Sequence, residues 1–230
     1  MNHIKACIFD LDGTLMMTLD SIAKAVNRTL AELGFPEMPV ENFNYYAGDG
    51  LNKSLERALI DAGDQGASRL QDGIGRCRRY FAEDPLYHVK PYPHMEKALG
   101  ELKKRNVRIA VFSNKPHAQA VEVVEKVFGK GTFDRIQGQT EGVPRKPDPS
   151  GAFRIMEELG AGQDECMYFG DTNTDMETGH AAGLYTVGVS WGFRPRSELE
   201  EYRADRILDD PSEIPEAVRE RDLEIASLRK

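Results

Sequence analysis

The 230-residue sequence is poor in the residues that build thiol or imidazole metal sites. It has three cysteines, Cys7, Cys77 and Cys166, an odd number without metal-like spacing, and we expect them to be small buried hydrophobic residues. Its five histidines show no ligand spacing either. A zinc site built from Cys and His is therefore not predicted.

Long apolar runs and an excess of positive charge are also missing. No apolar segment approaches the roughly 20 residues that span a bilayer, and the start of the chain lacks a signal-peptide core, so we expect a cytoplasmic protein without a membrane partner. The formal net charge of −8 argues against a broad nucleic-acid surface. It also means that an anionic substrate must be captured by local positive charge, such as a metal ion, Lys146 or Lys115.

The segment from Ala6 to Leu15 joins a short apolar run to two acidic residues and a glycine. Apolar residues in both alternating positions are typical of a parallel strand that is covered on both faces. Ligands of such sheets bind beyond the carboxyl ends of the strands, so we expect Asp10 and Asp12 to face a cleft. Their spacing can direct both acids at one metal ion or phosphoryl group. A solvated Asp-Gly turn is the alternative for this segment alone.

A second acidic segment, from Cys166 to Asp175, has the same order of features. A short apolar strand ends at a glycine, and Asp171 and Asp175 follow as a helix begins. The two segments together offer four carboxylates without a supporting His or Cys, a donor set that suits Mg²⁺ better than Zn²⁺. Because Mg²⁺ usually binds through one or two carboxylates together with substrate phosphates, the sequence predicts a small phosphorylated metabolite as substrate.

Two further polar sites lie between the acidic segments. One predicted strand ends in Ser113 and Asn114, whose hydroxyl and amide groups are good donors for phosphoryl oxygens. Lys146 is followed by two nearby prolines, which keep it in a loop. Taken singly, the first pair also fits a turn and the lysine also fits a solvated surface position.

The four segments together resemble the motifs of the haloacid dehalogenase superfamily of phosphohydrolases, in the same order. They are Asp10-Leu11-Asp12-Gly13-Thr14-Leu15, Ser113-Asn114, Lys146-Pro147 and Gly170-Asp171-Thr172-Asn173-Thr174-Asp175. Finer similarity is to phosphoglycolate phosphatases and related small phosphomonoesterases, through Ser113-Asn114-Lys115-Pro116, Gly48-Asp49-Gly50 and the stretch from Ala182 to Gly192. Many relatives follow Gly-Thr-Leu with one residue and then an Asp, whereas this chain has Met16 and Met17 there, which indicates a different connection to the second domain.

The resemblance implies Mg²⁺-dependent hydrolysis of a small phosphate monoester through an aspartyl phosphate. It assigns nucleophilic attack to Asp10 and proton transfer to Asp12, and phosphoryl positioning to Ser113 and Lys146. The residues expected to hold Mg²⁺ are Asp10, Asp12 through its backbone carbonyl, Asp171 and Asp175. The residues expected to bind the substrate are Gly13, Thr14, Asn114, Gly48, Asp49 and Gly50.

The apolar periodicity predicts an α/β fold, a doubly wound parallel sheet with a small inserted α-helical domain. Helical spacing without an intervening strand occurs at Ile22, Val26 and Leu30, at Leu51, Leu55 and Leu59, and at Leu70, Ile74, Cys77 and Phe81. Strands near 107–113, 134–138, 167–170 and 185–189 then alternate with helices, with 206–210 as a further edge strand. We therefore expect a catalytic core of residues 1–15 and 88–230, and a helical cap of residues 16–87.

Other functions share part of this pattern. A sugar-phosphate mutase of the same superfamily would keep the first acids. The resemblance to such mutases would call for a Glu-Asp pair, however, where this chain has Gly170 and Asp171. A dehalogenase would lack Asp12. A phospho-accepting signalling module also uses acids and a lysine on a parallel sheet, but is usually one small domain without a cap. Neither charge nor periodicity indicates an oligomer interface, so the oligomeric state is left open.

Overall fold

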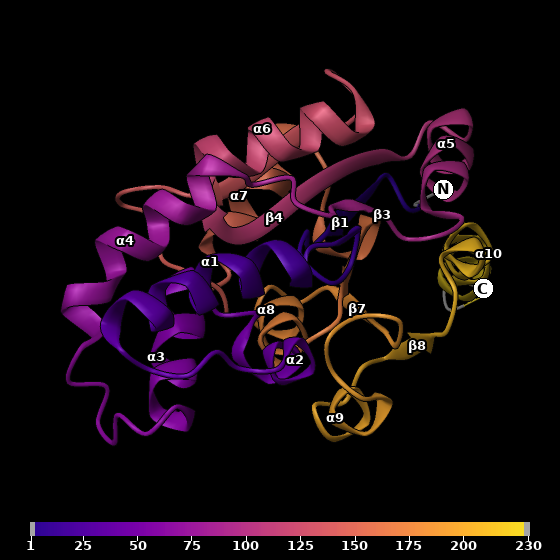
Figure 1. The fold of residues 1–230 in the computed structure, drawn as a ribbon. Helices are drawn as coiled ribbons and strands as arrows, with labels where there is room; N and C mark the ends of the chain where they lie inside the picture. The colour runs from indigo at the N-terminus through magenta and orange to yellow at the C-terminus, as the bar shows by residue number, and fades with distance from the viewer. Residues whose placement is uncertain (1–2, 228–230) are drawn as a thin grey trace.

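The computed structural model describes residues 3–227, and its centre is a six-stranded parallel sheet with the order β5-β4-β1-β6-β7-β8 (Figure 1). The strands of this sheet are β1 (Ala6–Phe9), β4 (Arg108–Pro116), β5 (Arg135–Gln139), β6 (Cys166–Gly170), β7 (Tyr185–Val189) and β8 (Arg206–Leu208). In the register of the central strands, Phe9 pairs with Val111 on one side and with Phe169 on the other. The predicted parallel sheet is confirmed, and β4 extends through Ser113 and Asn114 to Pro116.

Helices cover both faces of the sheet. One core cluster joins Cys7 and Phe9 of β1 to helices α5 (Met95–Lys104), α6 (His117–Phe128) and α10 (Ile214–Ser227). A second joins the alternate residues Ala6 and Ile8 to α7 (Ser150–Leu159) and to the segment after α8 (Asn173–Ala181). The short elements η2 (Gln163–Glu165), α9 (Arg196–Glu201) and η3 (Pro211–Glu213) complete the sheet layer. Within residues 3–227, no helix has both the length and the apolar character that crossing a membrane requires.

A separate helical layer lies between β1 and β4 in the chain and has its own apolar core (Figure 1). Its elements are α1 (Leu19–Leu33), η1 (Val40–Asn42), α2 (Phe43–Tyr46), α3 (Leu51–Asp61) and α4 (Leu70–Glu83). The three long helices match the three predicted apolar stripes, whereas η1 and α2 were not predicted. Gly73 on α4 packs so closely on Thr29, Leu33 and Leu55 that a Cβ there would lie 3.0–3.3 Å from their side chains. This glycine lets α4 approach α1 and α3.

Two short strands connect the helical layer to the sheet layer. β2 (Met16–Met17) pairs antiparallel with β3 (Lys90–Pro91), and the amide of Tyr92 donates to the carbonyl of Leu15 at 3.3 Å. Met16 is fully buried, whereas Met17 is exposed. Two-residue strands are too short to show an alternating pattern, so the sequence did not predict them. The two methionines that depart from the family pattern therefore form one strand of the connecting ribbon.

Candidate active site

Three acidic side chains meet at the carboxyl ends of β1 and β6. Asp10 follows β1, and its amide donates to the carbonyl of Phe169 at 2.9 Å, which sets the two strand ends side by side. Asp171 follows β6, and Asp175 lies in the first turn of α8. Carboxylate oxygens of Asp10, Asp171 and Asp175 all lie within 4.8 Å of one another, and all three residues are buried. The sheet thus brings together acids that are more than 160 positions apart in the sequence.

Lys146 supplies the positive charge inside this acidic group. Its Nζ lies 2.6 Å from Oδ1 of Asp10 and 2.7 Å from Oδ1 of Asp175, and its side chain is only 2% exposed. Burial alone would lower the pKa of Lys146, but the two carboxylates outweigh it and raise that pKa well above its ordinary value. The lysine is therefore a permanent cation at neutral pH.

Asn114 fixes the loop that carries Lys146. The Lys146 amide donates to Oδ1 of Asn114 at 2.9 Å, and Nδ2 of Asn114 donates to the Lys146 carbonyl at 3.3 Å. The strand end that was predicted from sequence thus positions the catalytic candidate on a loop about 30 residues further on. Asn114 also lines the pocket. The same side chain can therefore face a substrate, as predicted, and hold the backbone of Lys146.

The acidic group carries more negative than positive charge. Burial raises the pKa of Asp10 well above its usual range, Lys146 opposes the rise, and the other two acids add to it. Burial likewise raises the pKa of Asp171 to about 7, with a further contribution from Asp175. Three buried carboxylates beside one ammonium leave a charge deficit that a divalent cation can compensate, and oxygen donors suit a hard cation.

Glycines and hydrogen bonds hold Asp171 in one orientation. Thr14 Oγ1 donates to its Oδ1 at 2.9 Å, and the amide of Phe193 donates to its Oδ2 at 2.8 Å. A Cβ at Gly13 would lie 2.3 Å from Oδ2 of Asp171, and one at Gly192 would lie 2.2 Å from its Cβ. Gly13 also has a φ of +93°. Glycine is therefore required where the first acidic segment turns past Asp171.

Asp175 is fully engaged by protein groups. Its Oδ2 accepts from the amide and from Oγ1 of Thr172, at 3.1 Å and 2.7 Å, which also caps the start of α8. Its Oδ1 accepts from Lys146 and, at 3.2 Å, from the hydroxyl of Tyr168. Tyr168 was not among the predicted site residues, because in sequence it is one more apolar position of a buried strand.

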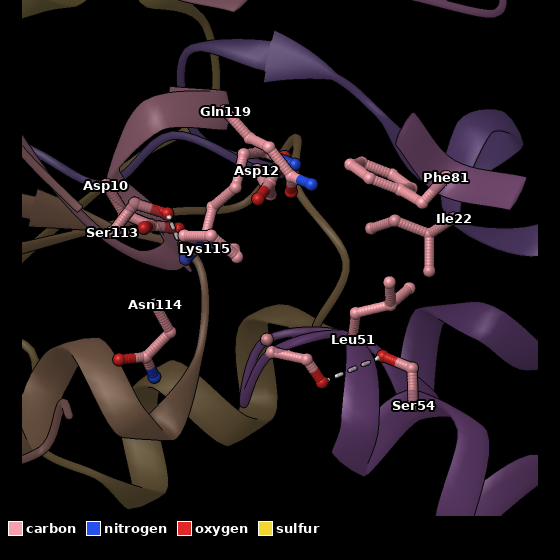
Figure 2. A pocket seen from close by; sticks show the side chains of 13 residues that line it. Asp10, Asp12, Ile22, Leu51, Ser54, Phe81, Ser113, Asn114, Lys115 and Gln119 are labelled. Carbon is pink, nitrogen blue, oxygen red and sulfur yellow. Dashed lines mark hydrogen bonds and ion pairs between the residues drawn. The ribbon is translucent and has the colours of Figure 1, made fainter. Parts of the chain in front are cut away.

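Asp12 lies outside the three-carboxylate group and faces a different cation. Its Oδ1 is 3.0 Å from Nζ of Lys115, whose side chain is 5% exposed. Lys115 is linked in turn to Ser113, because its amide donates to the serine Oγ at 3.1 Å. Asp10, Asp12, Ser113 and Lys115 all line one pocket (Figure 2).

This pocket lies between the two layers. Figure 2 shows the acids and Lys115 on the side of the sheet, with Ile22, Leu51 and Phe81 of the helical layer opposite them. Its cavity volume is about 30 Å³, much less than the several hundred Å³ of typical ligand sites. The arrangement is thus a closed one, and a ligand must be small or enter as the layers separate.

The loop between α2 and α3 takes part in holding the layers together. Gly48 and Gly50 line the pocket, but Asp49 instead accepts from Thr174 Oγ1 at 2.7 Å and forms an ion pair with Arg57. Asp49 therefore links the helical layer to α8. Neither Arg57 nor Lys53, which is paired with Glu56, is among the residues that line the pocket.

Arg194 is a further contact between the layers that the sequence gave no reason to select. Its Nη2 donates to the carbonyls of Ala47 at 2.9 Å and of Tyr45 at 3.5 Å, and its Nε lies 3.3 Å from Glu198. It is buried and follows β7 in a loop. A single arginine without a motif around it carries no local signal for this role, because the partners that link it to the helical layer are backbone carbonyls almost 150 positions away.

Comparison with known proteins agrees with this geometry. Residues 7–189 match the family described as haloacid dehalogenase-like hydrolase. The chain is 31% identical over 207 residues to a phosphoglycolate phosphatase of Aquifex aeolicus (strain VF5), covering 90% of this chain and 94% of that protein.

Solved structures show the same fold. A candidate phosphoglycolate phosphatase from Lactobacillus delbrueckii subsp. bulgaricus superposes with a TM-score of 0.87 at 29% identity, covering 94% of this chain and 98% of that one. A β-phosphoglucomutase from Clostridium difficile shares the fold at 20% identity, with a TM-score of 0.78 and coverage of 97% and 99%. The fold alone thus does not separate phosphatase from mutase. From the sequence match and the assembled site, the chain belongs to the family of haloacid dehalogenase-like hydrolases.

Proposed function

We propose that this protein is a Mg²⁺-dependent phosphatase that hydrolyses a small, phosphoglycolate-like phosphate monoester through an aspartyl phosphate on Asp10. The observation that carries the proposal is the buried group of Asp10, Asp171 and Asp175 around Lys146 at the end of two parallel strands. A surface acidic cluster would not need a buried lysine. The phosphoglycolate phosphatase relative, aligned over nearly its whole length, supports a phosphate ester as the substrate.

The residues that would hold the metal are those with oxygens still available. Asp10 has only its Oδ1 in contact with Lys146, and Asp171 keeps its orientation through Thr14 and Phe193. The family resemblance adds the backbone carbonyl of Asp12. We assign Asp175 a supporting role, because both of its oxygens already accept two hydrogen bonds each. When bound, Mg²⁺ would neutralise charge on the phosphoryl oxygens.

The chemistry divides among four side chains. Asp10 attacks phosphorus and forms the acyl phosphate, and splitting one displacement into two lowers the barrier of each. Asp12 gives a proton to the departing alcohol and later takes one from the water that cleaves the acyl phosphate. Lys146 holds the nucleophile in place and, together with Ser113, stabilises the phosphoryl oxygens as charge develops on them. Closure of the two layers would exclude bulk water during the first step, and the water for the second step would enter after the alcohol has left.

The helical layer would act as the cap. We propose the division into a core of residues 1–15 and 88–230 and a cap of residues 16–87, with the β2–β3 ribbon as its connection. The pocket lies between these parts, and cap residues such as Phe81 and Leu51 form its outer wall. Opening and closing of such lids admits the substrate and then excludes water.

A mutase function is disfavoured by one position in the site. A Cβ at Gly170 would lie 2.2 Å from the Cβ of Asp175 and 2.3 Å from its Cγ. The site therefore has no room for the Glu side chain that the mutase pattern would place at position 170, unless Asp175 and the start of α8 move. Analysis of the products separates the two functions, because a phosphatase releases inorganic phosphate and a mutase returns the phosphoryl group to the sugar.

The metal requirement gives the first prediction. We expect a panel of small phosphate esters to include at least one that is hydrolysed with Mg²⁺, and we expect EDTA to lower that rate by about 10²-fold or more, since the metal supplies several kcal/mol of charge stabilisation. Release of inorganic phosphate measures the rate, and excess Mg²⁺ should restore it. Full activity of the chelated protein would contradict the metal role, and stable phosphorylation without turnover would favour a signalling module.

The second prediction concerns Asp12. An Asp12→Asn variant should hydrolyse the same ester about 10²–10⁴-fold more slowly, the usual contribution of a positioned acid or base. The variant should also accumulate phosphorylated protein, because an amide does not deprotonate the attacking water. Intact-protein mass spectrometry after a substrate pulse detects this adduct. Wild-type turnover in the variant would refute the proton-transfer role.

A further inference from the structure

Lys115 has no place in the mechanism above, although it stands in the pocket. Within the part of the chain that the structure describes, it is the only cationic side chain among the residues lining this pocket. Lys146 lies behind Asp10 and is not part of the lining. A substrate that carries a second negative charge besides its phosphate would therefore meet Lys115.

The contacts of Lys115 prepare its ammonium for such an anion. The side chain is 5% exposed, its Nζ is 3.0 Å from Asp12, and it lies 4.6 Å from the centre of the Phe81 ring. An ammonium group has three N–H donors, and the face of an aromatic ring adds attraction without taking an acceptor position. The Asp12 contact falls short of hydrogen-bond geometry, since Oδ1 of Asp12 has no hydrogen-bond partner. Among residues 3–227, no acceptor forms a hydrogen bond of good geometry with this ammonium, which thus keeps donors for a ligand.

The walls of the pocket limit what the rest of the leaving group can be. Ile22, Leu51 and Phe81 come from three different cap helices and face the acids (Figure 2). With the cap closed, the cavity volume is about 30 Å³. This closed pocket favours a short leaving alcohol, with its apolar carbon part against the cap and its charge directed at the core.

We propose that Lys115 determines substrate specificity by binding a carboxylate on the leaving alcohol, attached to the carbon that bears the ester oxygen. The proposal rests on the proposed function, because it takes Asp12 as the proton donor. That role places the ester oxygen within about 2.6–3.2 Å of the Asp12 carboxylate. Lys115 lies 3.0 Å from the same carboxylate, so only an anion very close to the ester oxygen reaches its ammonium.

The test compares esters that differ only in the carboxylate. Phosphoglycolate and ethyl phosphate have the same number of carbon atoms, and 3-phosphonooxypropionate carries its carboxylate one carbon further away. The kcat/KM for each ester is measured with Mg²⁺ for the wild-type protein and for Lys115→Gln, which removes the charge but keeps a polar N–H group on the side chain. Lys115→Arg keeps the charge. Lys53→Gln on α3 is the matched control, because Lys53 is a half-exposed lysine paired with Glu56.

The readout is the ratio of kcat/KM for phosphoglycolate to that for ethyl phosphate. If a substitution at Lys115 disturbs Asp12, it slows the hydrolysis of both esters alike, and this effect cancels in the ratio. We expect wild-type protein to favour phosphoglycolate by about 10–100-fold, the value of a hydrogen bond to a charged group. Lys115→Gln should bring the ratio to within about threefold of one, whereas Lys115→Arg and Lys53→Gln should retain most of the preference. Wild-type protein should also favour phosphoglycolate over the longer acid.

The opposing outcomes separate this inference from the proposed function. If wild-type protein hydrolyses ethyl phosphate as well as phosphoglycolate, or if Lys115→Gln keeps the wild-type ratio, the specificity role of Lys115 is wrong and the phosphatase function stands. If no phosphate ester is hydrolysed with Mg²⁺, the proposed function fails first. The chain-length comparison uses wild-type protein only, so the inference stays testable even if a substituted protein does not fold.

Discussion

Asp10→Asn is expected to lower turnover by about 10⁴-fold or more, a loss on the scale seen when a catalytic nucleophile is removed. The amide has nearly the same volume as the carboxylate, but it does not attack phosphorus and is a poor metal ligand. The fold should persist, because the substitution removes one of three buried carboxylates and leaves Lys146 paired with Asp175 at 2.7 Å. Phosphate release measures the activity, and thermal denaturation measures the fold.

The control for Asp10→Asn is the same substitution at an exposed acid. Asp72 on α4 has a side chain that is 59% exposed, and it forms an ion pair with Arg69, the residue just before this helix. Asp72→Asn should keep activity within about twofold, because exposed ion pairs contribute little. If Asp10→Asn hydrolysed the same ester at more than a few per cent of the wild-type rate, Asp10 would not be the nucleophile. An aspartyl phosphate on Asp10 would then be excluded.

The meeting of the acids was predictable from sequence, because it depends on topology. Apolar runs before Asp10 and Asp171 predict strands, and parallel strands present their carboxyl ends at one edge of a sheet. No knowledge of the intervening 160 residues is needed for that step. The three long helices of the helical layer were predictable for a similar reason, since each repeats its apolar residues at helical spacing and buries that stripe in one cluster.

The contacts that orient these side chains were not predictable, because they join groups without local patterns. Asn114 was expected at the substrate, but the structure also has it bound to the backbone of Lys146. The amide of Phe193 binds Asp171, and any residue other than proline offers an amide. Arg194 holds the carbonyl of Ala47 across the two layers, and nothing near it in sequence distinguishes it from a surface arginine.

The turn of residues 48–50 also has contacts that the sequence did not predict. Gly48, Asp49 and Gly50 were predicted as one substrate-binding unit, because two glycines flank an acid. The glycines do line the pocket, yet Asp49 contacts Thr174 and Arg57. Sequence spacing locates a turn well, but which side chain of the turn faces the ligand depends on the element packed against it.

Lys146→Met is expected to reduce both stability and turnover. Removing one partner of a buried ion pair costs about 3–5 kcal/mol, because the remaining charge loses its compensation. Here Lys146 compensates both Asp10 and Asp175, and its side chain is 2% exposed, so methionine would fill the space but leave the carboxylates unpaired. Turnover should fall by about 10²-fold or more, since one preorganised donor is worth that much. Urea unfolding and phosphate release measure the two effects.

A second substitution distinguishes lost charge from lost packing. Lys146→Met combined with Asp175→Asn removes the carboxylate whose partner has gone, so the double variant should be more stable than Lys146→Met alone by about 1 kcal/mol or more. Addition of Mg²⁺ should stabilise Lys146→Met more than it stabilises the wild-type protein, because a bound cation supplies the missing positive charge. A surface control, Lys53→Met, should change stability by less than about 0.5 kcal/mol. If Lys146→Met unfolded at the wild-type urea concentration, the acids would not depend on Lys146 for compensation, and the buried group would need another source of positive charge.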